Sequence, residues 1–119
     1  MKHCLIVENS RVLRKVASGI LEQLHFVPQE AADTLSALDV CRVSMPDAIL
    51  LDVPQPAGLE FLRKLRRQDN GDHPVVVLCT TENDVPLIEE MMSAGADDYI
   101  LKPFDRGVLA DKLAQVGLI

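Results

Sequence analysis

The alternation of two kinds of segment constrains the fold of this chain more than any other feature. Short apolar runs of strand length occur five times, and each is followed by an amphipathic stretch of helical length. The clearest run, residues 48–51, is continuously apolar and lies between turn signals, which is typical of a central parallel strand covered on both faces. This alternation predicts an α/β fold, a parallel sheet with helices on both of its faces.

The same pattern places the individual elements. The predicted strands lie at residues 3–7, 26–31, 48–51, 74–79 and 99–101, and Pro28 moves the second of them to a sheet edge. Ser10, Asp33 or Thr34, and Asp84 are the predicted helix caps. The third and fifth helices are expected over about residues 59–68 and 105–115. The side chains expected to face the core are Val12, Val16, Ile20, Leu24, Leu35, Leu38, Cys41, Val85, Ile88, Met91, Met92, Val108, Leu109 and Leu113.

Composition bounds the class of protein. A chain of 119 residues has room for one domain, residues 1–119, with its own core. The 18 acidic and 12 basic residues give a net charge of −6, which argues against non-specific binding to nucleic acid or to an anionic membrane. The sequence shows no membrane-spanning run and no signal peptide. Three widely spaced cysteines without a C-x-x-C motif indicate reduced thiols in a cytoplasmic protein.

Polar side chains collect where the predicted strands end. Glu8 and Asn9 follow the first strand, Asp52 the third, Thr80 the fourth and Lys102 the fifth. Because parallel strands point the same way, these residues should share one edge of the sheet, where open α/β sheets bind ligands. Taken alone, Asp52 is better explained as a cap of the segment that follows it.

The chemistry of this set is that of phosphoryl transfer. An aspartate can accept a phosphoryl group as an acyl phosphate. Carboxylates and a strand-end carbonyl suit Mg²⁺, which prefers oxygen ligands. Mg²⁺ and the Lys102 ammonium would neutralise the transferring group, and the Thr80 hydroxyl would donate a hydrogen bond to it.

Four stretches carry a resemblance to a known family. They are Val7-Glu8-Asn9-Ser10, Leu50-Leu51-Asp52 with Pro56, Thr80-Thr81-Glu82-Asn83-Asp84, and Ala94-Gly95-Ala96-Asp97-Asp98-Tyr99 running into Leu101-Lys102-Pro103-Phe104. With them the chain resembles the receiver domain of two-component response regulators along its full length, and more narrowly the single-domain chemotaxis (CheY-like) members. The resemblance implies a flavodoxin-like, doubly wound, five-stranded parallel sheet with five helices.

The resemblance also implies roles for individual residues. Asp52 would accept a phosphoryl group from a histidine kinase, Thr80 would contact that group, and Lys102 would pair with it. Mg²⁺ would be held by Glu8, Asn9, Asp52 and the backbone carbonyl of Pro54. Tyr99 would swing inward as the surface of the fourth and fifth helices rearranges, and a cis peptide bond would precede Pro103. Such a protein is a phosphoacceptor in signalling, not an enzyme with a substrate of its own. Its expected downstream partner is a protein such as a flagellar motor switch component.

Two features depart from the family pattern at the site itself. Asn9 stands where the family has a second acidic residue, so the cage has one negative charge fewer and its affinity for Mg²⁺ should be lower. The loop after Asp52 reaches Gly58 two residues sooner than is usual, and Pro54 restricts the backbone where the metal-binding carbonyl is expected.

These features leave more than one function open. The first is a phosphorylation switch, and the second is a degenerate receiver that binds its partner without phosphorylation. A small enzyme on the same sheet is a distant third, since the chain has no glycine-rich phosphate loop after its first strand and no G-x-S-x-G. No DNA-binding segment follows the receiver-like sequence, so output is expected through protein contact. The basic residues Arg63, Lys64, Arg66 and Arg67 are interpreted as a solvated helix face.

Overall fold

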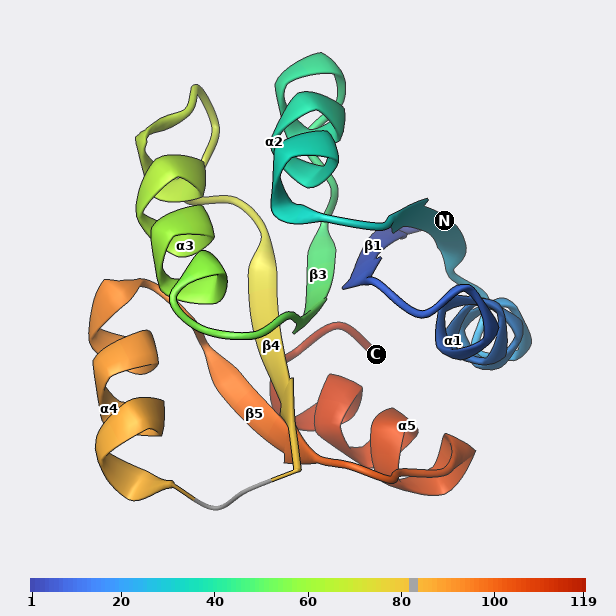
Figure 1. Cartoon of the computed structure of the whole chain (residues 1–119). Coiled ribbons are helices and arrows are strands. Elements are labelled where there is room, and N and C mark those ends of the chain that lie inside the picture. Colours follow the sequence, from blue (N-terminus) through green and yellow to red (C-terminus); the bar gives the residue numbers. More distant parts are fainter. Residues whose placement is uncertain (82–83) are drawn as a thin grey trace.

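The computed structural model spans residues 1–119 and describes all of them except residues 82–83. Two members of the Thr80–Asp84 motif, Glu82 and Asn83, therefore lie outside the described residues. Strands and helices alternate along the chain (Figure 1). The order is β1 (His3–Glu8), α1 (Arg11–Gln23), β2 (Val27–Ala31), α2 (Thr34–Val43), β3 (Ala48–Asp52), α3 (Ala57–Arg67), β4 (Val75–Thr80), α4 (Val85–Ala94), β5 (Asp98–Leu101) and α5 (Arg106–Gln115).

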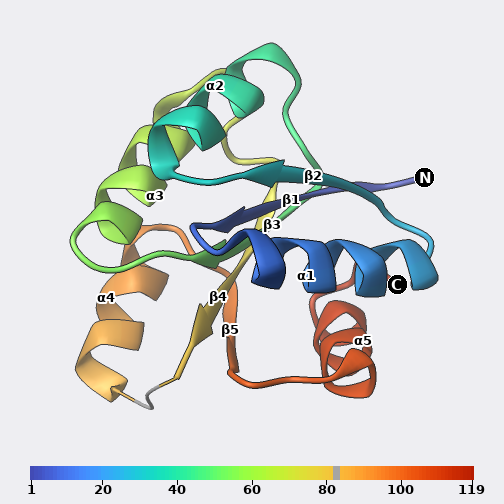
Figure 2. The ribbon, with the colours of Figure 1, turned by 45° about the vertical axis from the view of Figure 1, so that its right-hand side comes forward.

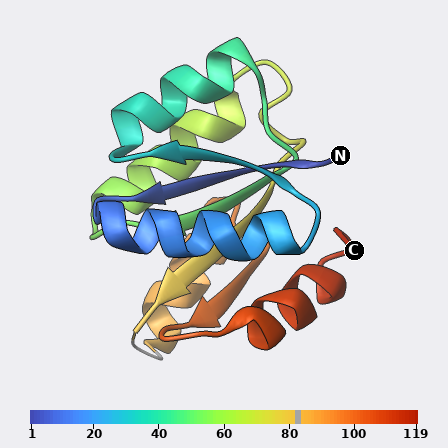
Figure 3. The same ribbon diagram turned by 90° about the vertical axis from the view of Figure 1, so that its right-hand side faces the viewer.

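All five strands form one parallel sheet in the order β2-β1-β3-β4-β5. β3 is central and β2 lies at an edge, as its proline predicted. Figure 3 shows the strand arrowheads at the same end of the sheet. The register sets Glu8 directly beside Asp52 and Thr80 beside Leu101. The predicted doubly wound α/β fold is therefore confirmed.

Helices cover both faces of the sheet (Figure 2). On one face α2, α3 and α4 contribute Cys41, Phe61, Leu62, Leu65 and Met91 to a core that includes alternate strand residues such as Leu5, Ile49 and Leu51. On the other face Leu21 of α1 and Leu109 and Leu113 of α5 pack against Ile6, Leu50 and Ile100. Successive side chains of a strand point to opposite faces, so the continuous apolar run of β3 feeds both cores.

Side-chain caps fix the start of four helices. Ser10, Asp33, Asp84 and Asp105 each accept a hydrogen bond from the backbone N–H three residues later. The caps predicted at Ser10, Asp33 and Asp84 are thus confirmed. Pro56 provides no side-chain cap for α3, which begins at Ala57, two residues before the predicted start. The short loop joins the helix directly, because the Glu60 N–H already donates to the Pro56 carbonyl at 3.1 Å.

The prediction of the inward face was wrong for several helices. Val12 and Val16 of α1 are 71% and 56% exposed, and the buried residues of that helix are Ser18 and Leu21. A row of residues spaced by four drifts around a helix of 3.6 residues per turn, so its first members leave the core face. Leu35, Val85, Met92 and Val108 are exposed as well, although each was expected to be inward. Among the described residues, no helix is long and apolar enough to cross a membrane.

Candidate functional site

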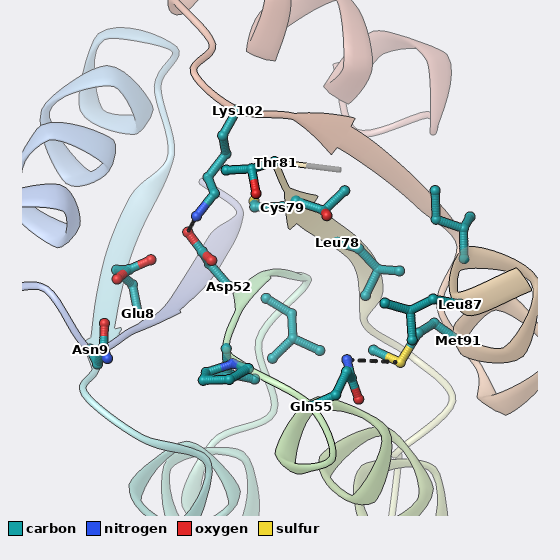
Figure 4. A pocket seen from close by; sticks show the side chains of 15 residues that line it. Glu8, Asn9, Asp52, Gln55, Leu78, Cys79, Thr81, Leu87, Met91 and Lys102 are labelled. Carbon is teal, nitrogen blue, oxygen red and sulfur yellow. Dashed lines mark hydrogen bonds and ion pairs between the residues drawn. The ribbon is translucent and has the colours of Figure 1, made fainter. Parts of the chain in front are cut away.

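A cleft opens at the carboxyl ends of β1, β3, β4 and β5. Its volume is about 370 Å³. It is lined by six of the residues singled out from the sequence, namely Glu8, Asn9, Asp52, Pro54, Thr80 and Lys102. Figure 4 shows Glu8, Asn9 and Lys102 on one side of the cleft and an apolar wall of Leu78, Leu87 and Met91 on the other. Parallel strands bring these residues together from positions up to 94 apart in the chain (102 − 8).

Asp52 and Lys102 form the centre of the cleft. The Lys102 ammonium Nζ lies 2.6 Å from Oδ2 of Asp52, and the two side chains are 25% and 21% exposed. Lys102 is held at the end of β5 by its own N–H, which donates to the carbonyl of Thr80 at 2.7 Å. The peptide bond that follows, Lys102–Pro103, is cis as expected. This charge-assisted hydrogen bond is partly shielded from solvent and lies at the floor of the cleft.

Glu8 lies beside this pair and is almost completely buried. Its Oε1 accepts a hydrogen bond from the Ser10 N–H at 2.9 Å, and its carbonyl accepts one from Arg14 Nη1 at 2.7 Å. Burial raises the pKa of the Glu8 carboxyl above its ordinary value of 4.5, and its hydrogen bond to the Asp52 carboxyl raises it further. The two neighbouring acids thus differ in environment, since Asp52 has the ammonium as a direct partner.

The donor set suits a hard cation. The cleft offers carboxylate oxygens of Glu8 and Asp52, the amide oxygen of the exposed Asn9 and the carbonyl of Pro54, all of them oxygen ligands. The described part of the chain contains no cluster of three or more His, Cys, Asp or Glu side chains that could hold a metal ion. The cleft has two carboxylates, where an acidic residue at position 9 would make three; the fit to Mg²⁺ rests on these two together with the neutral oxygens of Asn9 and Pro54.

The other predicted residues are placed as follows. Thr80 lines the cleft from the end of β4. Tyr99 does not line it; its side chain packs partly buried against the core under α2, α3 and α4, and the Lys112 ammonium lies 5.8 Å from the centre of its ring. Cys79 also lines the cleft. Burial raises the pKa of its thiol, and the negative charge of Asp52 raises it further. A thiol kept protonated in this way is a poor nucleophile.

Gln55, in the shortened loop, was not recognised from the sequence. Its Nε2 donates to Sδ of Met91 at 3.4 Å, and its Oε1 accepts from the Leu59 N–H at 3.2 Å. It therefore connects the loop after Asp52 to α4 and to the first turn of α3 (Figure 4). Its position between two prolines ahead of an uncapped helix is the only signal in the sequence that points to it.

The interpretation of Arg66 as part of a solvated basic face was wrong. Its guanidinium donates to the carbonyls of Gly95, Gly71 and Pro74 at 2.6–3.1 Å and pairs with Asp97 at 3.2 Å. Arg63, Lys64 and Arg67 are exposed, as expected for a solvated face. Of these four basic side chains only Arg66 points toward the end of α4. Which of them does so depends on where α3 packs against α4, and the local sequence does not show it.

Comparison with known proteins agrees with the geometry. The family model of the response regulator receiver domain matches residues 4–114, so the chain belongs to this family. The transcriptional regulatory protein CseB of Streptomyces avermitilis is 35% identical over 116 residues; these cover 96% of this chain and 48% of CseB, so the chain spans about half of that relative. The chemotaxis protein CheY4 of Vibrio cholerae superimposes with a TM-score of 0.91 at 28% identity, over 98% of each chain.

A second solved structure shows a metal in the corresponding cleft. The receiver domain of the sensor histidine kinase PA1611 from Pseudomonas aeruginosa superimposes with a TM-score of 0.84 at 29% identity, over 96% of this chain and 95% of that one. Its active-site cleft holds a magnesium ion. The CheY-like, flavodoxin-like fold of the present chain is thus shared with a chemotaxis protein and with the receiver domain of a sensor histidine kinase.

Proposed function

We propose that Asp52 accepts a phosphoryl group from a histidine kinase and that the chain then signals through contact with a downstream protein. Receiver domains are signalling domains and partners of histidine kinases. The observation that carries the proposal is the 2.6 Å pair between Asp52 and Lys102 at the floor of the cleft. This pair joins a nucleophilic carboxylate to the cation that the phosphorylated product needs.

Each residue of the cleft has a separate role in the proposed phosphoryl transfer. Asp52 supplies the attacking oxygen, and Lys102 moves from the carboxylate to the bound phosphoryl group, whose charge it neutralises. The Thr80 hydroxyl donates a hydrogen bond to the same group. Glu8 lies beside Asp52 and would share the metal ion with it.

Mg²⁺ completes the proposed site. Glu8, Asn9, Asp52 and the carbonyl of Pro54 would hold it, as the cleft of the PA1611 receiver holds magnesium. When bound, Mg²⁺ offsets the negative charge of the phosphoryl group and of the two carboxylates. Asn9 contributes an oxygen but no charge, so we expect weaker binding than an acidic residue would give.

Output passes through α4 and β5 in this proposal. Gln55 joins the loop after Asp52 to Met91 of α4, so a new dianion at Asp52 acts on a loop already in contact with that helix. Tyr99, on the neighbouring β5, is the residue proposed to change position. The likeness to CheY4 supports a role in chemotaxis, with a motor switch component as the downstream partner.

A degenerate receiver remains the second candidate function. Asn9 and the contracted loop favour it, because both weaken the metal site while leaving the fold intact. This candidate predicts that the Asp52→Ala variant binds its partner as tightly as the wild type.

Labelling experiments test the first candidate against the second. A phosphorylated histidine kinase with Mg²⁺ should transfer its phosphoryl group to the wild type and leave Asp52→Ala unlabelled, as read by intact-protein mass spectrometry. Lys102→Ala should lower the initial rate on the order of 100-fold, the cost of losing one charge-stabilising donor. An unlabelled wild type, tested with kinases of the same organism, would contradict the proposal and favour the degenerate receiver.

A further inference from the structure

Arg14 is a charged side chain that α1 turns inward. It is only 15% exposed, whereas Arg11 and Lys15 on the same helix are exposed. Its Nη1 donates to the backbone carbonyl of Glu8 at 2.7 Å, and its Nε pairs with Oε1 of Glu30 at 3.2 Å. A guanidinium is costly to withdraw from water unless its donors are paired, so these two contacts define how it is oriented.

The carbonyl that Arg14 holds belongs to the peptide between two of the predicted metal ligands, Glu8 and Asn9. Both of these residues line the cleft. The C=O of Glu8 and the N–H of Asn9 lie in one rigid plane, so a hydrogen bond that directs this carbonyl also directs the backbone of Asn9. The register of β1 with β2 ends at Val7, one residue before this peptide. Arg14 therefore restrains the chain where the ladder to β2 stops and the cleft begins.

The other contact of Arg14 lies outside the cleft. Glu30 belongs to the edge strand β2 and does not line the cleft. Its second oxygen, Oε2, accepts from Lys15 Nζ at 2.9 Å and from the Ser18 hydroxyl at 3.2 Å. The hydrogen bond from Lys15 is the largest of the effects that lower the pKa of the Glu30 carboxyl, so this group is ionised at neutral pH. A charged acid held by three donors gives Arg14 a fixed anchor.

We propose that Arg14 is a positioning residue of the Mg²⁺ site, because it holds the Glu8–Asn9 peptide so that both side chains face the cleft. It thereby raises the affinity of the site for Mg²⁺ and its preference for this ion. The inference rests on the proposed function, since the ion is part of that proposal. Arg14 does not line the cleft, so it acts through the ligands and does not touch the ion. Mg²⁺ demands near-octahedral geometry, which makes its binding sensitive to the orientation of the ligands.

The sign of the effect separates positioning from charge. A guanidinium near the site repels a divalent cation, so loss of its charge alone would strengthen Mg²⁺ binding. Loss of a group that orients metal ligands weakens binding instead. Arg14→Met keeps an apolar stem and removes the donors and the charge. We expect its affinity for Mg²⁺ to be on the order of tenfold lower than that of the wild type.

Lys15→Met is the matched control. It removes one positive charge from the same helix and one contact of the same Glu30, but it leaves the hydrogen bond to the Glu8 carbonyl in place. Because the charge of the exposed Lys15 is screened by salt, its loss should change the affinity for Mg²⁺ by no more than about twofold.

Arg14→Lys is the second test variant. It keeps the positive charge, but an ammonium does not reproduce the planar fork of donors that reaches Glu8 and Glu30 together. We therefore expect most of the loss in Mg²⁺ affinity to remain. If only one of the two Arg14 variants folds, its affinity decides the test.

Titration calorimetry with Mg²⁺ and with Ca²⁺ measures the effect, and circular dichroism checks that each variant is folded at the temperature used. Ca²⁺ accepts irregular coordination more readily than Mg²⁺ does. Arg14→Met should therefore lose less affinity for Ca²⁺ than for Mg²⁺. A purely structural role of Arg14 would lower the stability of the fold without changing the ratio of the two affinities.

The outcomes distinguish this inference from the proposed function. Weaker Mg²⁺ binding by the Arg14 variants, with a smaller loss for Ca²⁺ and with neither change in Lys15→Met, supports the positioning role. Unchanged or tighter Mg²⁺ binding by the Arg14 variants overturns it, as do equal losses for the two ions or an equal loss in Lys15→Met, and phosphoryl transfer to Asp52 is left intact. A wild type that binds no Mg²⁺ overturns the inference together with the proposed metal site, and labelling of Asp52 by a kinase tests the transfer separately.

Discussion

At the scale of single residues, the site is governed by two neighbouring carboxylates, Glu8 and Asp52, in different surroundings. Lys102 contacts Asp52 directly, and Glu8 is buried beside them without a cation as its direct partner among the described side chains. Burial makes the ionised form of an acid in that position unfavourable. A bound divalent cation would offset this cost by pairing with the carboxylate. The pH dependence of stability and the response to Mg²⁺ should both report it.

The Glu8→Gln variant tests this electrostatic arrangement. Because the folded pKa of Glu8 is raised, its contribution to stability is complete below its ordinary value of 4.5 and is lost as the pH rises through the folded pKa. Without divalent ions, Glu8→Gln should therefore unfold at a higher urea concentration than the wild type at neutral pH. The difference should disappear below pH 4.5.

The control is Glu22→Gln, an exposed acid on α1 whose change should leave the urea midpoint nearly unaltered. Saturating Mg²⁺ should reverse the order, since glutamine contributes no charge to a metal ligand set. A wild type that is more stable than Glu8→Gln at neutral pH in the absence of Mg²⁺ would contradict this account of Glu8.

Asn9 is the residue with the most direct bearing on metal affinity. Asn9→Asp adds a negative charge at the edge of the cleft, so we expect Mg²⁺ to bind on the order of tenfold more tightly. Gln115→Glu, an equal change in charge at an exposed position outside the cleft, is the control. Titration calorimetry measures both, and equal affinities for Asn9→Asp and the wild type would exclude position 9 from the metal site.

The residues at the floor of the site could be predicted from residue types and their order. The side-chain contacts that hold the surrounding loop and helices in place could not. Glu8, Asp52, Thr80 and Lys102 end strands, so the parallel sheet alone brings them to one edge. The contacts of Gln55 depend on the path of a loop and on the distance to α4. No local pattern in the sequence encodes that distance.

At the scale of secondary structure, Arg66 is the brace between α3 and α4. It satisfies the carbonyl of Gly95, where α4 ends with a positive φ of 124°, and two further carbonyls before β4. Four basic residues occur in this part of α3, and the sequence alone does not show which one turns inward. The orientation follows from where the end of α4 lies.

Replacing Arg66 should therefore destabilise the fold. Arg66→Ala removes the side-chain donor of three carbonyls and the ion-pair partner of Asp97, at a cost of about 3 kcal/mol in the free energy of unfolding. Arg66→Lys should recover little of it, because an ammonium cannot reproduce the planar fork of donors. Urea denaturation measures the loss. Arg67→Ala, the exposed neighbour, should change stability by no more than about 0.5 kcal/mol, and equal losses at the two positions would contradict the brace.

The α1 helix shows why the existence of an element is easier to predict than its orientation. Its cap and extent follow from Ser10 and the apolar spacing, and both agree with the structure. The expected core face does not agree with the structure, because Val12 and Val16 are exposed and Val16 lines a groove open to solvent. An apolar stripe in the sequence indicates burial against something, and that partner need not belong to the same fold.

At the scale of the whole molecule, one aspartate lies at the carboxyl end of the central strand, and a cavity reaches it from either face of the sheet. The family and the fold are established, and the two cavities meet at the Asp52–Lys102 pair. A phosphoryl group at Asp52 would draw Lys102 away from the carboxylate and add negative charge next to the loop that contacts α4. Phosphorylation thus changes only a few contacts, but they lie at the centre of the site. A few changed contacts are enough to shift the balance between two conformations of similar free energy.

A crystal structure with Mg²⁺ and beryllofluoride tests this central claim most directly. The account predicts beryllofluoride on a carboxylate oxygen of Asp52, with Lys102 Nζ and the Thr80 hydroxyl within hydrogen-bond distance of its fluorides and Mg²⁺ between Glu8, Asn9 and the Pro54 carbonyl. Crystals grown at saturating concentrations in which Asp52 carries no beryllofluoride and Lys102 still pairs with its carboxylate would contradict it.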